Sequence, residues 1–506
     1  WLAWRHEVTL DFVLEVAEAV FEAGGVLMVE TSANDASGNE LGFDPTLLRW
    51  CPIVALVPEV GPPAWGEQAR AGVRAWSDYL AMLKHARSCA PGRPVLPLTY
   101  GVNPADASRQ LALVLASADG FFETNFDGYM TGSVGPKFRE RAFRLVSLLS
   151  GPRLSQARVA VLFSRATRDY VDGYVNDIYD VSGTIHMAAF RGAVETLVRV
   201  GVRFDVRPVE ELRRGELDGY EVVIAPQVRC LGDGARRALR EFEGALLVIG
   251  ELGSMDEMGD PAEPLEAGVE VTIGDLADLL AEYASEVEAP EGVVVEEFSI
   301  PGCRLAAVVA TAEARPGEFR VPKGSWVLSL DSWSARPSDG VEPIPNSAAL
   351  VILEASPGDG DLDLDRAIAW APSSVDSALN PEARRLRGAE PPSTVIALGG
   401  PQVYPGGWEG SEVEFLRDGG TYHALKYPNG TLEASFGSED YAVVWVTGCG
   451  GISLVRVAGV TRFGTRAALL WLLSRGEVDG EYTILRWVDD GDGAVELAEV
   501  EVVASW

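Results

Sequence analysis

The segment Val457–Ala468 reads Val-Ala-Gly-Val-Thr-Arg-Phe-Gly-Thr-Arg-Ala-Ala. Its apolar beginning is typical of a buried strand, and its Gly-Thr-Arg-Ala-Ala end is typical of a helix that continues through Leu and Trp residues. Strands that pass directly into helices are the units from which α/β sheets are built. The segment therefore predicts an α/β fold for the last part of the chain.

Further patterns surround this segment in a fixed order. An apolar strand at Val395–Leu398 stops at Gly-Gly-Pro, another lies at Asp440–Val446, and Leu485–Trp487 leads into the acidic loop Asp489–Gly493. The ordered set resembles the C-terminal region of archaeal surface-layer and surface-layer-associated proteins, over about a fifth of the chain. This resemblance implies an extracellular protein at a cell surface.

Length and composition indicate the number of domains and the classes of partner that the chain can bind. At roughly 100–200 residues per domain, 506 residues predict three or four domains, and 47% hydrophobic residues are enough for several cores. The net charge of −33 excludes nucleic acid and anionic lipid as partners, and it suits divalent cations, basic partners or neutral sugars. Basic charge is carried almost entirely by Arg, which is typical of a thermophile and equally of a GC-rich genome.

The first residue of the chain and its hydropathy give expectations about processing and membrane insertion. The chain begins at Trp1 without an initiator Met, as a mature or cut product would. It contains no run of eighteen apolar residues, so we expect no transmembrane segment. Any membrane anchor is expected outside these residues or in a partner.

Residues 1–152 alternate short apolar strands with amphipathic helices, which predicts a parallel sheet covered by helices. The expected strands are Val26–Glu30, Ile53–Val57, Pro94–Thr99 and Phe121–Glu123. Four such strands make half of a (β/α)8 barrel. The last strand and the aromatic, basic helix after it resemble the end of a glycoside-hydrolase barrel.

In glycoside-hydrolase barrels the residues at the carboxyl ends of strands carry the chemistry, so the resemblance implies Glu30, Glu59 and Glu123 as candidates. Two carboxylates about 5–10 Å apart are the minimum for glycoside hydrolysis. The segment Leu98–Gly101 departs from the family pattern, because the next-to-last strand ends there without an acid. The alternative is that the three glutamates cap helices, pair with Arg or face solvent.

A half barrel also leaves two sheet edges unpaired. We therefore expect either self-association, a second polypeptide that supplies the first half together with its catalytic acid, or a smaller open sheet.

Residues 153–288 predict a doubly wound, flavodoxin-like parallel sheet with strands at Val159–Phe163, Phe204–Val206, Val222–Pro226 and Leu246–Gly250. The domain resembles the glutamine-amidotransferase-like domain that follows the barrel in trimeric β-galactosidases, where it mediates assembly. No glycine-rich phosphate loop follows the first strand, which excludes a nucleotide site. Cys230 lacks a nucleophile elbow and His186 is distant in sequence, so we expect a structural thiol there.

Residues 289–346 switch to a period of two and predict a small antiparallel β domain, and residues 347–506 predict the α/β domain described above. Trp326 and Trp333 are candidates for stacking on sugar rings, with packing in the core as the alternative.

Several isolated residues suggest binding or modification. The acidic loop offers Asp489, Asp490, Asp492 and Glu496 as possible calcium ligands, although the EF-hand spacing is missing and a solvated acidic loop is the alternative. Asn429 begins a glycosylation sequon.

The cysteines and histidines suggest no metal site. The five cysteines contain no Cys-x-x-Cys pair and the four histidines are dispersed in sequence. Cys51 and Cys89 fall in one predicted domain and are the favoured pair for a bridge, with a buried free thiol as the expected state of each.

Two functions follow from these observations. The first is a structural protein of an archaeal cell surface built on a glycoside-hydrolase-derived scaffold. The second is the C-terminal part of a surface-attached, β-galactosidase-like glycoside hydrolase that acts on poly- or oligosaccharides. The first is preferred on the sequence, because a complete pair of catalytic acids is not visible.

Overall fold

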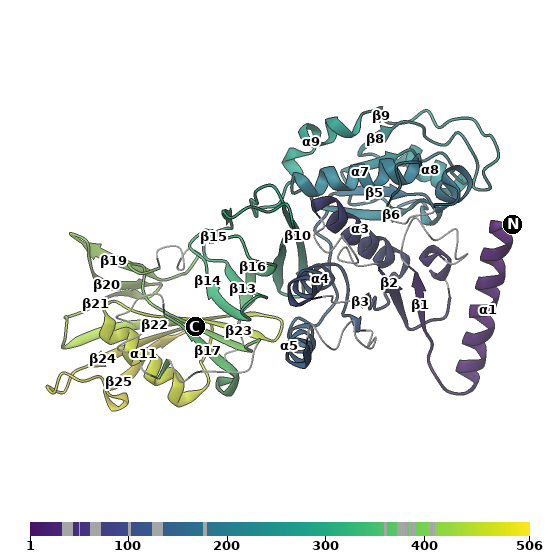
Figure 1. Cartoon of the computed structure of the whole chain (residues 1–506). Coiled ribbons are helices and arrows are strands. Elements are labelled where there is room, and N and C mark those ends of the chain that lie inside the picture. Colours follow the sequence, from purple (N-terminus) through teal and green to yellow (C-terminus); the bar gives the residue numbers. More distant parts are fainter. Residues whose placement is uncertain are drawn as a thin grey trace.

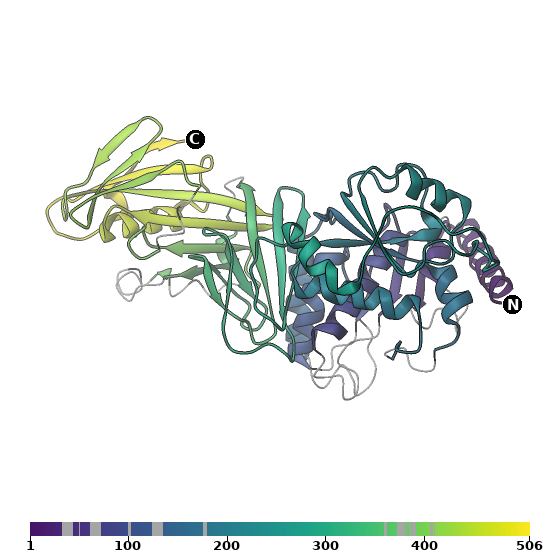
Figure 2. The ribbon, with the colours of Figure 1, turned by 90° about the horizontal axis from the view of Figure 1, so that it is seen from above.

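The computed structural model is a mixed α/β protein of several units, with its helical units at one end and its strand-rich units at the other (Figures 1 and 2). The described residues are 1–32, 44–49, 51–60, 72–99, 103–123, 135–175, 180–358, 362–371, 380, 382–383, 386, 391–404, 408 and 410–506. Among these, no helix is both long and apolar enough to cross a bilayer.

The first unit contains a parallel four-stranded sheet in the order β1-β2-β3-β4, as the alternating pattern predicted. Its strands are β1 (Met28–Ser32), β2 (Ala55–Glu59), β3 (Leu98–Thr99) and β4 (Phe122–Glu123), and its helices are α1 (Leu2–Glu22), α3 (Val73–Cys89), α4 (Pro104–Ser117) and α5 (Gly135–Leu148). Helix α1 buries His6, Val13 and Ala17, which lie on one face at helical spacing.

The second unit has a parallel sheet in the order β6-β5-β7-β8-β9, which confirms a doubly wound arrangement with β5 at the crossover. Its elements are β5 (Val159–Phe163), α6 (Arg165–Thr167), α7 (His186–Arg199), β6 (Phe204–Pro208), β7 (Val222–Pro226), α8 (Asp233–Glu241), β8 (Ala245–Ile249), β9 (Val269–Glu270) and α9 (Leu276–Leu279). Strands β5 and β7 are buried along their whole length, which explains their unbroken apolar sequences.

Strands of the two predicted C-terminal domains join into one eleven-stranded sheet, whose main path is β10-β11-β16-β22-β23-β18-β17. These strands are β10 (Val293–Ile300), β11 (Cys303–Ala310), β16 (Ala348–Pro357), β22 (Glu439–Cys449), β23 (Ile452–Gly459), β18 (Thr394–Leu398) and β17 (Ala367–Trp370). Strand β16 makes the connection because it is long enough to pair with β11 at one end and with β22 at Ser356 and Pro357.

Shorter strands branch from this sheet or lie beside it. They are β12 (Glu318–Arg320), β13 (Trp326–Ser329), β14 (Ser334–Pro337), β15 (Val341–Pro343), β19 (Glu414–Asp418), β20 (Thr421–Tyr427), β21 (Gly430–Glu433), β24 (Tyr482–Val488) and β25 (Val500–Ser505). Strands β13, β14, β24 and β25 extend the large sheet, while the others form separate antiparallel sheets.

The segment Val457–Ala468 makes the predicted passage from strand to helix. Strand β23 ends at Gly459, and helix α11 (Arg462–Arg475) begins after Thr461, whose side chain accepts a hydrogen bond from the Phe463 backbone N–H. The glycine is required because a Cβ at Gly459 would overlap the backbone of Thr461 and Thr465. The close turn lets α11 lie back on β22 and β23 with its Ala and Leu residues buried.

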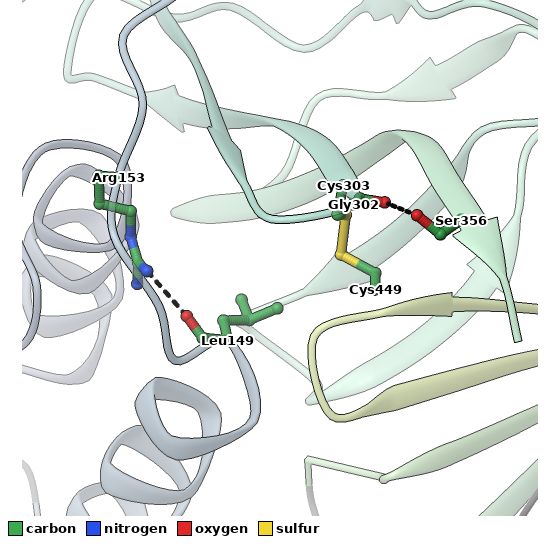
Figure 3. Close-up of a disulfide and its surroundings, with 6 residues drawn as sticks. All are labelled: Leu149, Arg153, Gly302, Cys303, Ser356 and Cys449. Carbon is green, nitrogen blue, oxygen red and sulfur yellow. Dashed lines mark hydrogen bonds between the residues drawn. A yellow bond between two sulfur atoms is a disulfide. The ribbon is translucent and has the colours of Figure 1, made fainter. Parts of the chain in front are cut away.

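A disulfide joins Cys303 to Cys449 across the junction of the sheet (Figure 3). The favoured pair Cys51–Cys89 is therefore wrong, and both residues are buried free thiols, as is Cys230. The bridge links the β10–β11 turn to the β22–β23 turn, two points that are 146 residues apart in the chain. Only the pairing of β16 with β22 brings these turns together.

Candidate active site

The carboxyl ends of the four parallel strands of the first unit meet at one edge of the sheet. Glu59 and Glu123 are the last residues of β2 and β4, and Glu30 lies two residues before the end of β1. Glu30 on β1 is level with Val57 on β2, two residues before Glu59, and Glu59 is level with Leu98 on β3. Glu30 and Glu59 therefore occupy positions that face the same side of the sheet.

Strand geometry gives the spacing of this pair. Two residues along a strand and one step between strands separate the Cα atoms of Glu30 and Glu59 by roughly 8 Å. Glu30 is exposed and Glu59 is half-buried. Glutamate side chains that leave the same face at this Cα spacing are long enough to bring their carboxyl groups to the roughly 5–10 Å that glycoside hydrolysis needs.

Glu123 occupies a different register position. It is level with Thr99, one residue beyond the level of Leu98 and Glu59. Four polar residues that follow these strands in the sequence, Asn34, Tyr100, Asn125 and Asp127, lie outside the described residues.

Sequence reasoning missed a buried charge network that joins this unit to the second one. Arg168 is fully buried, and its Nη1 donates to Asp44 Oδ2 at 2.7 Å while its Nη2 lies 2.8 Å from Asp169 Oδ1. Burial by itself would raise the pKa of Asp44, but the Arg168 guanidinium holds it well below the usual range. His6 of α1 lies 3.7 Å from Asp169 Oδ2, and burial lowers its pKa, so it is neutral at pH 7.

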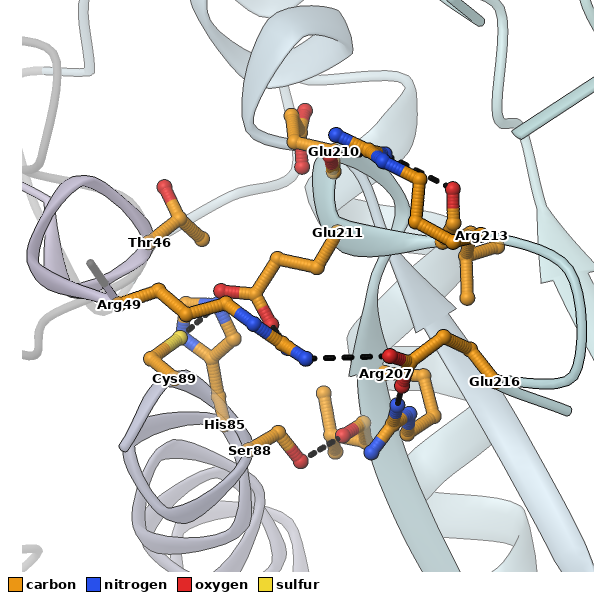
Figure 4. Close-up of polar contacts among 12 residues, drawn as sticks. Thr46, Arg49, His85, Ser88, Cys89, Arg207, Glu210, Glu211, Arg213 and Glu216 are labelled. Atoms are coloured by element: carbon orange, nitrogen blue, oxygen red, sulfur yellow. Dashed lines mark hydrogen bonds and ion pairs between the residues drawn. The ribbon is translucent and has the colours of Figure 1, made fainter. Parts of the chain in front are cut away.

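A second network supports the same interface (Figure 4). Arg49 forms ion pairs with Glu211 and Glu216, and Arg207 donates to Glu216 at 2.5 Å. Burial raises the pKa of Glu211 to about 7 despite the adjacent Arg49. The only sequence signal for either network is the presence of Arg and acidic residues beside apolar strands, which is too common to be diagnostic.

Cys230 and His186 do not form a nucleophile and base. The two ring nitrogens of His186 are engaged, with Nε2 accepting from the Ser164 N–H at 2.9 Å and Nδ1 donating to the Pro226 carbonyl at 2.8 Å. Burial raises the pKa of the Cys230 thiol to about 11. The thiol stays protonated at neutral pH, so this group is structural, as the sequence indicated.

The two tryptophans proposed for sugar stacking are buried. Trp326 is 2% exposed and lies under the Arg456 guanidinium, 4.9 Å from the ring centre. Trp333 is 3% exposed and packs edge-on against Phe138. Rings enclosed in this way present no face to a sugar, which corrects the stacking expectation in favour of core packing.

The acidic loop between β24 and β25 gathers Asp489, Asp490 and Asp492 with Glu499. Glu496, the fourth predicted calcium ligand, instead forms a capping box with Glu499. The Glu499 carboxylate accepts from Trp487 Nε1 at 3.0 Å and from the Asp490 N–H at 2.8 Å. These donors already satisfy part of the oxygen set that a calcium ion would need, so calcium binding stays a prediction.

Asn429 of the sequon lies in the turn between β20 and β21, and its side chain is exposed. A glycan at this position stays a prediction.

Comparison with known proteins gives structural likenesses at low identity. No family model and no curated protein matches the chain. A catalytic mutant of Gan42B, a GH42 beta-galactosidase from G. stearothermophilus, matches over 59% of this chain and 59% of its own length, with 11% identity and a TM-score of 0.44.

Two other solved structures are similar. The beta-galactosidase of Marinomonas ef1 matches over 69% of this chain and 67% of its own, with 12% identity and a TM-score of 0.47. The exo-carrageenase GH42 of Bacteroides ovatus matches over 70% of this chain and 56% of its own, with 10% identity and a TM-score of 0.49. The chain thus spans roughly three fifths of the length of these structures, and its structural neighbours are glycoside hydrolases.

Proposed function

We propose that this chain supplies part of the active site of a glycoside hydrolase, with Glu30 and Glu59 as its carboxylate pair. The observation that supports the proposal is the register of β1 and β2, in which Glu59 ends β2 and Glu30 lies on the same face, two residues before the end of β1. In glycoside hydrolysis one carboxylic acid protonates the leaving oxygen, and the other carboxylate attacks the sugar or activates a water. Glu123 is the third candidate at the same edge.

The proposal includes a second set of βα units that closes the barrel, from another copy of the chain or from a second polypeptide. Within the described residues, β1 and β4 each have one unpaired edge. Helix α1, beside β1, carries an exposed apolar stripe of Trp1, Trp4, Val8 and Phe12, which we call the α1 stripe. A parallel sheet edge next to such a stripe is suited to a further βα unit.

The test is hydrolysis of nitrophenyl β-glycosides and of β-linked oligosaccharides by natively purified material. We expect Glu59→Gln to lower kcat/KM by at least about a thousandfold in the assembled enzyme, because the reaction needs both carboxylates. Glu30→Gln is expected to give a comparable loss. Glu270→Gln, at an exposed position on β9, is the matched control and should keep full activity.

Retention of activity by Glu59→Gln and Glu30→Gln would reject this carboxylate pair. Intact-mass analysis of the same material identifies a second polypeptide, if one supplies the rest of the barrel.

The second candidate function is a structural protein at an archaeal cell surface. The disulfide and the exposed Asn429 favour an extracellular chain for both candidates, because disulfides persist in oxidising compartments. Ordered polymers of this chain alone, with no hydrolysis of any glycoside, would favour the structural role over catalysis.

A further inference from the structure

A cavity of about 220 Å³ lies where the first, second and strand-rich units meet. Its wall is formed by residues of α3, the end of α4, β6 and β10. The volume is smaller than the roughly 300–1,000 Å³ of sites for drug-sized ligands, so it suits a single small ring. The sheet edge that carries Glu30 and Glu59 contributes nothing to this cavity.

Arg153 lines the cavity and is 7% exposed. Its Nε donates to the Leu115 carbonyl at 2.6 Å, and its Nη1 donates to the Leu149 carbonyl at 2.8 Å (Figure 3). Its Nη2 has no hydrogen-bond partner, and no carboxylate of the described residues lies within 4.0 Å of the guanidinium. Burial lowers the pKa of Arg153 to about 10, so the side chain is still charged at pH 7.

Ser117, at the end of α4, lines the same cavity. It is 6% exposed, and its hydroxyl has no hydrogen-bond partner. A buried donor without a partner is destabilising, and two of them beside one cavity indicate a place where a ligand supplies acceptors.

The remaining charges of the wall decide the charge of that ligand. Lys84 pairs with Glu296 at 2.5 Å, Arg87 pairs with Asp119, and Arg207 pairs with Glu216 at 2.5 Å, so each of these cations already has an acidic partner. Arg153 is the remaining cation of the described wall, and its guanidinium is suited to a carboxylate group of the ligand.

Asp205 indicates a second property of the ligand, a group that donates hydrogen bonds. Its carboxylate accepts from Ser155 Oγ at 2.8 Å and from Tyr220 Oη at 2.8 Å, and no cation of the described chain lies within 4.0 Å of it. Each carboxylate oxygen has capacity for a further donor, which a ligand hydroxyl group can fill. The Phe298 side chain adds an apolar part to the wall.

We propose that this cavity binds a small polyhydroxy carboxylate, such as a sugar acid, with its carboxylate on Arg153 Nη2 and Ser117 Oγ. The hydroxyl groups of the ligand donate to Asp205. The site is separate from the carboxylate pair at the sheet edge and does not depend on catalysis there.

Isothermal titration of the whole chain with D-glucuronate tests the site. We expect one molecule bound per chain, with Ser117→Ala weakening binding about fivefold through the loss of one hydrogen bond. Arg153→Lys keeps the charge but loses the planar fork, and we expect a further loss of at least about tenfold. Ser147→Ala, at an exposed position on α5, is the matched control and should bind like the wild type.

Three outcomes would overturn the proposal. The first is a folded wild-type chain that gives no heat with glucuronate even at tens of millimolar. The second is unchanged affinity in Ser117→Ala, whose fold is checked by circular dichroism. The third is equal or tighter binding of neutral glucose or of inorganic phosphate, which would show that a sugar-linked carboxylate is not recognised.

Discussion

Asp440 shows how one buried residue organises the C-terminal unit. Its carboxylate accepts from the Thr461 hydroxyl at 2.5 Å and from the backbone N–H groups of Gly464 and Tyr441 at 2.6 and 2.8 Å. The side chain is fully buried, and it fixes the start of α11 against β22. The strand, the turn and the helix of the decisive segment thus depend on one acid from elsewhere in the chain.

We expect Asp440→Asn to lower the free energy of unfolding by roughly 2–3 kcal/mol. The Asn side chain has the same shape as that of Asp. Its NH2 group, however, is a donor in place of an acceptor oxygen, and it faces the hydroxyl and N–H donors that the carboxylate accepted from. Urea unfolding measures the change, and Asp418→Asn at an exposed position is the control. Equal midpoints for the two variants would contradict the role assigned to Asp440.

Glu296 predicts a pH dependence of stability. Burial raises its pKa from 4.5 to about 7, although the Lys84 ammonium opposes this shift. Between these values the folded state keeps the proton and the unfolded state has lost it, so stability falls as the pH rises from about 4.5 to about 7.

We therefore expect Glu296→Gln to make this fall shallower, because the amide does not titrate. Some slope remains, since the pKa of Glu211 is also raised to about 7. Thermal unfolding across the window measures the slope, with Glu270→Gln as the exposed control. An unchanged slope in Glu296→Gln would show that this carboxyl does not contribute.

At the scale of elements, the pairing of neighbouring strands decides which side chains meet. Register brings Glu30 and Glu59 onto one face, and the pairing of β16 with β22 creates the junction that the disulfide crosses. Both effects depend on partners that are distant in sequence. A shift of one residue in either ladder would separate these groups.

The disulfide should be a large contributor to the stability of the strand-rich units. It closes a loop of 146 residues, for which loop entropy gives a stabilisation of about 4–5 kcal/mol. We expect the Cys303→Ser substitution to lower the urea midpoint of unfolding. Chemical reduction of the wild type should lower the midpoint as much as the substitution does. Cys51→Ser, which removes a free thiol, is the control, and an unchanged midpoint after reduction would exclude a stabilising role.

At the scale of the whole molecule, helix α1 lies at the end of the protein away from the eleven-stranded sheet (Figure 1). The two buried charge networks hold the first and second units together, and the outer side of α1 is left uncovered. The first and second units are therefore held together, and the α1 stripe is an apolar face available for association.

We expect Trp4→Glu combined with Phe12→Glu to abolish association through this face. Both side chains are exposed, at 59% and 64%, so the charges should not lower the thermal stability of the chain itself. Native mass spectrometry measures the assembly, with Glu18→Gln on the same helix as the control. An assembly of unchanged mass in the double variant would exclude the α1 stripe as its interface.

The sequence by itself determined the local elements and the parallel sheets. Apolar runs such as Val159–Phe163 depend only on neighbouring residues, so their pattern could be interpreted correctly. Strand ends were located less exactly, since the first strand was predicted to end at Glu30 and ends at Ser32 instead.

Only the tertiary structure decided which of these residues come together. The Cys303–Cys449 bridge, the burial of Trp326 and the cavity beside Arg153 depend on contacts between segments far apart in the chain. A local sequence pattern does not predict such contacts, since the same residues could lie at the surface or in the core. The pairing of distant strands and the packing of whole units supply that information.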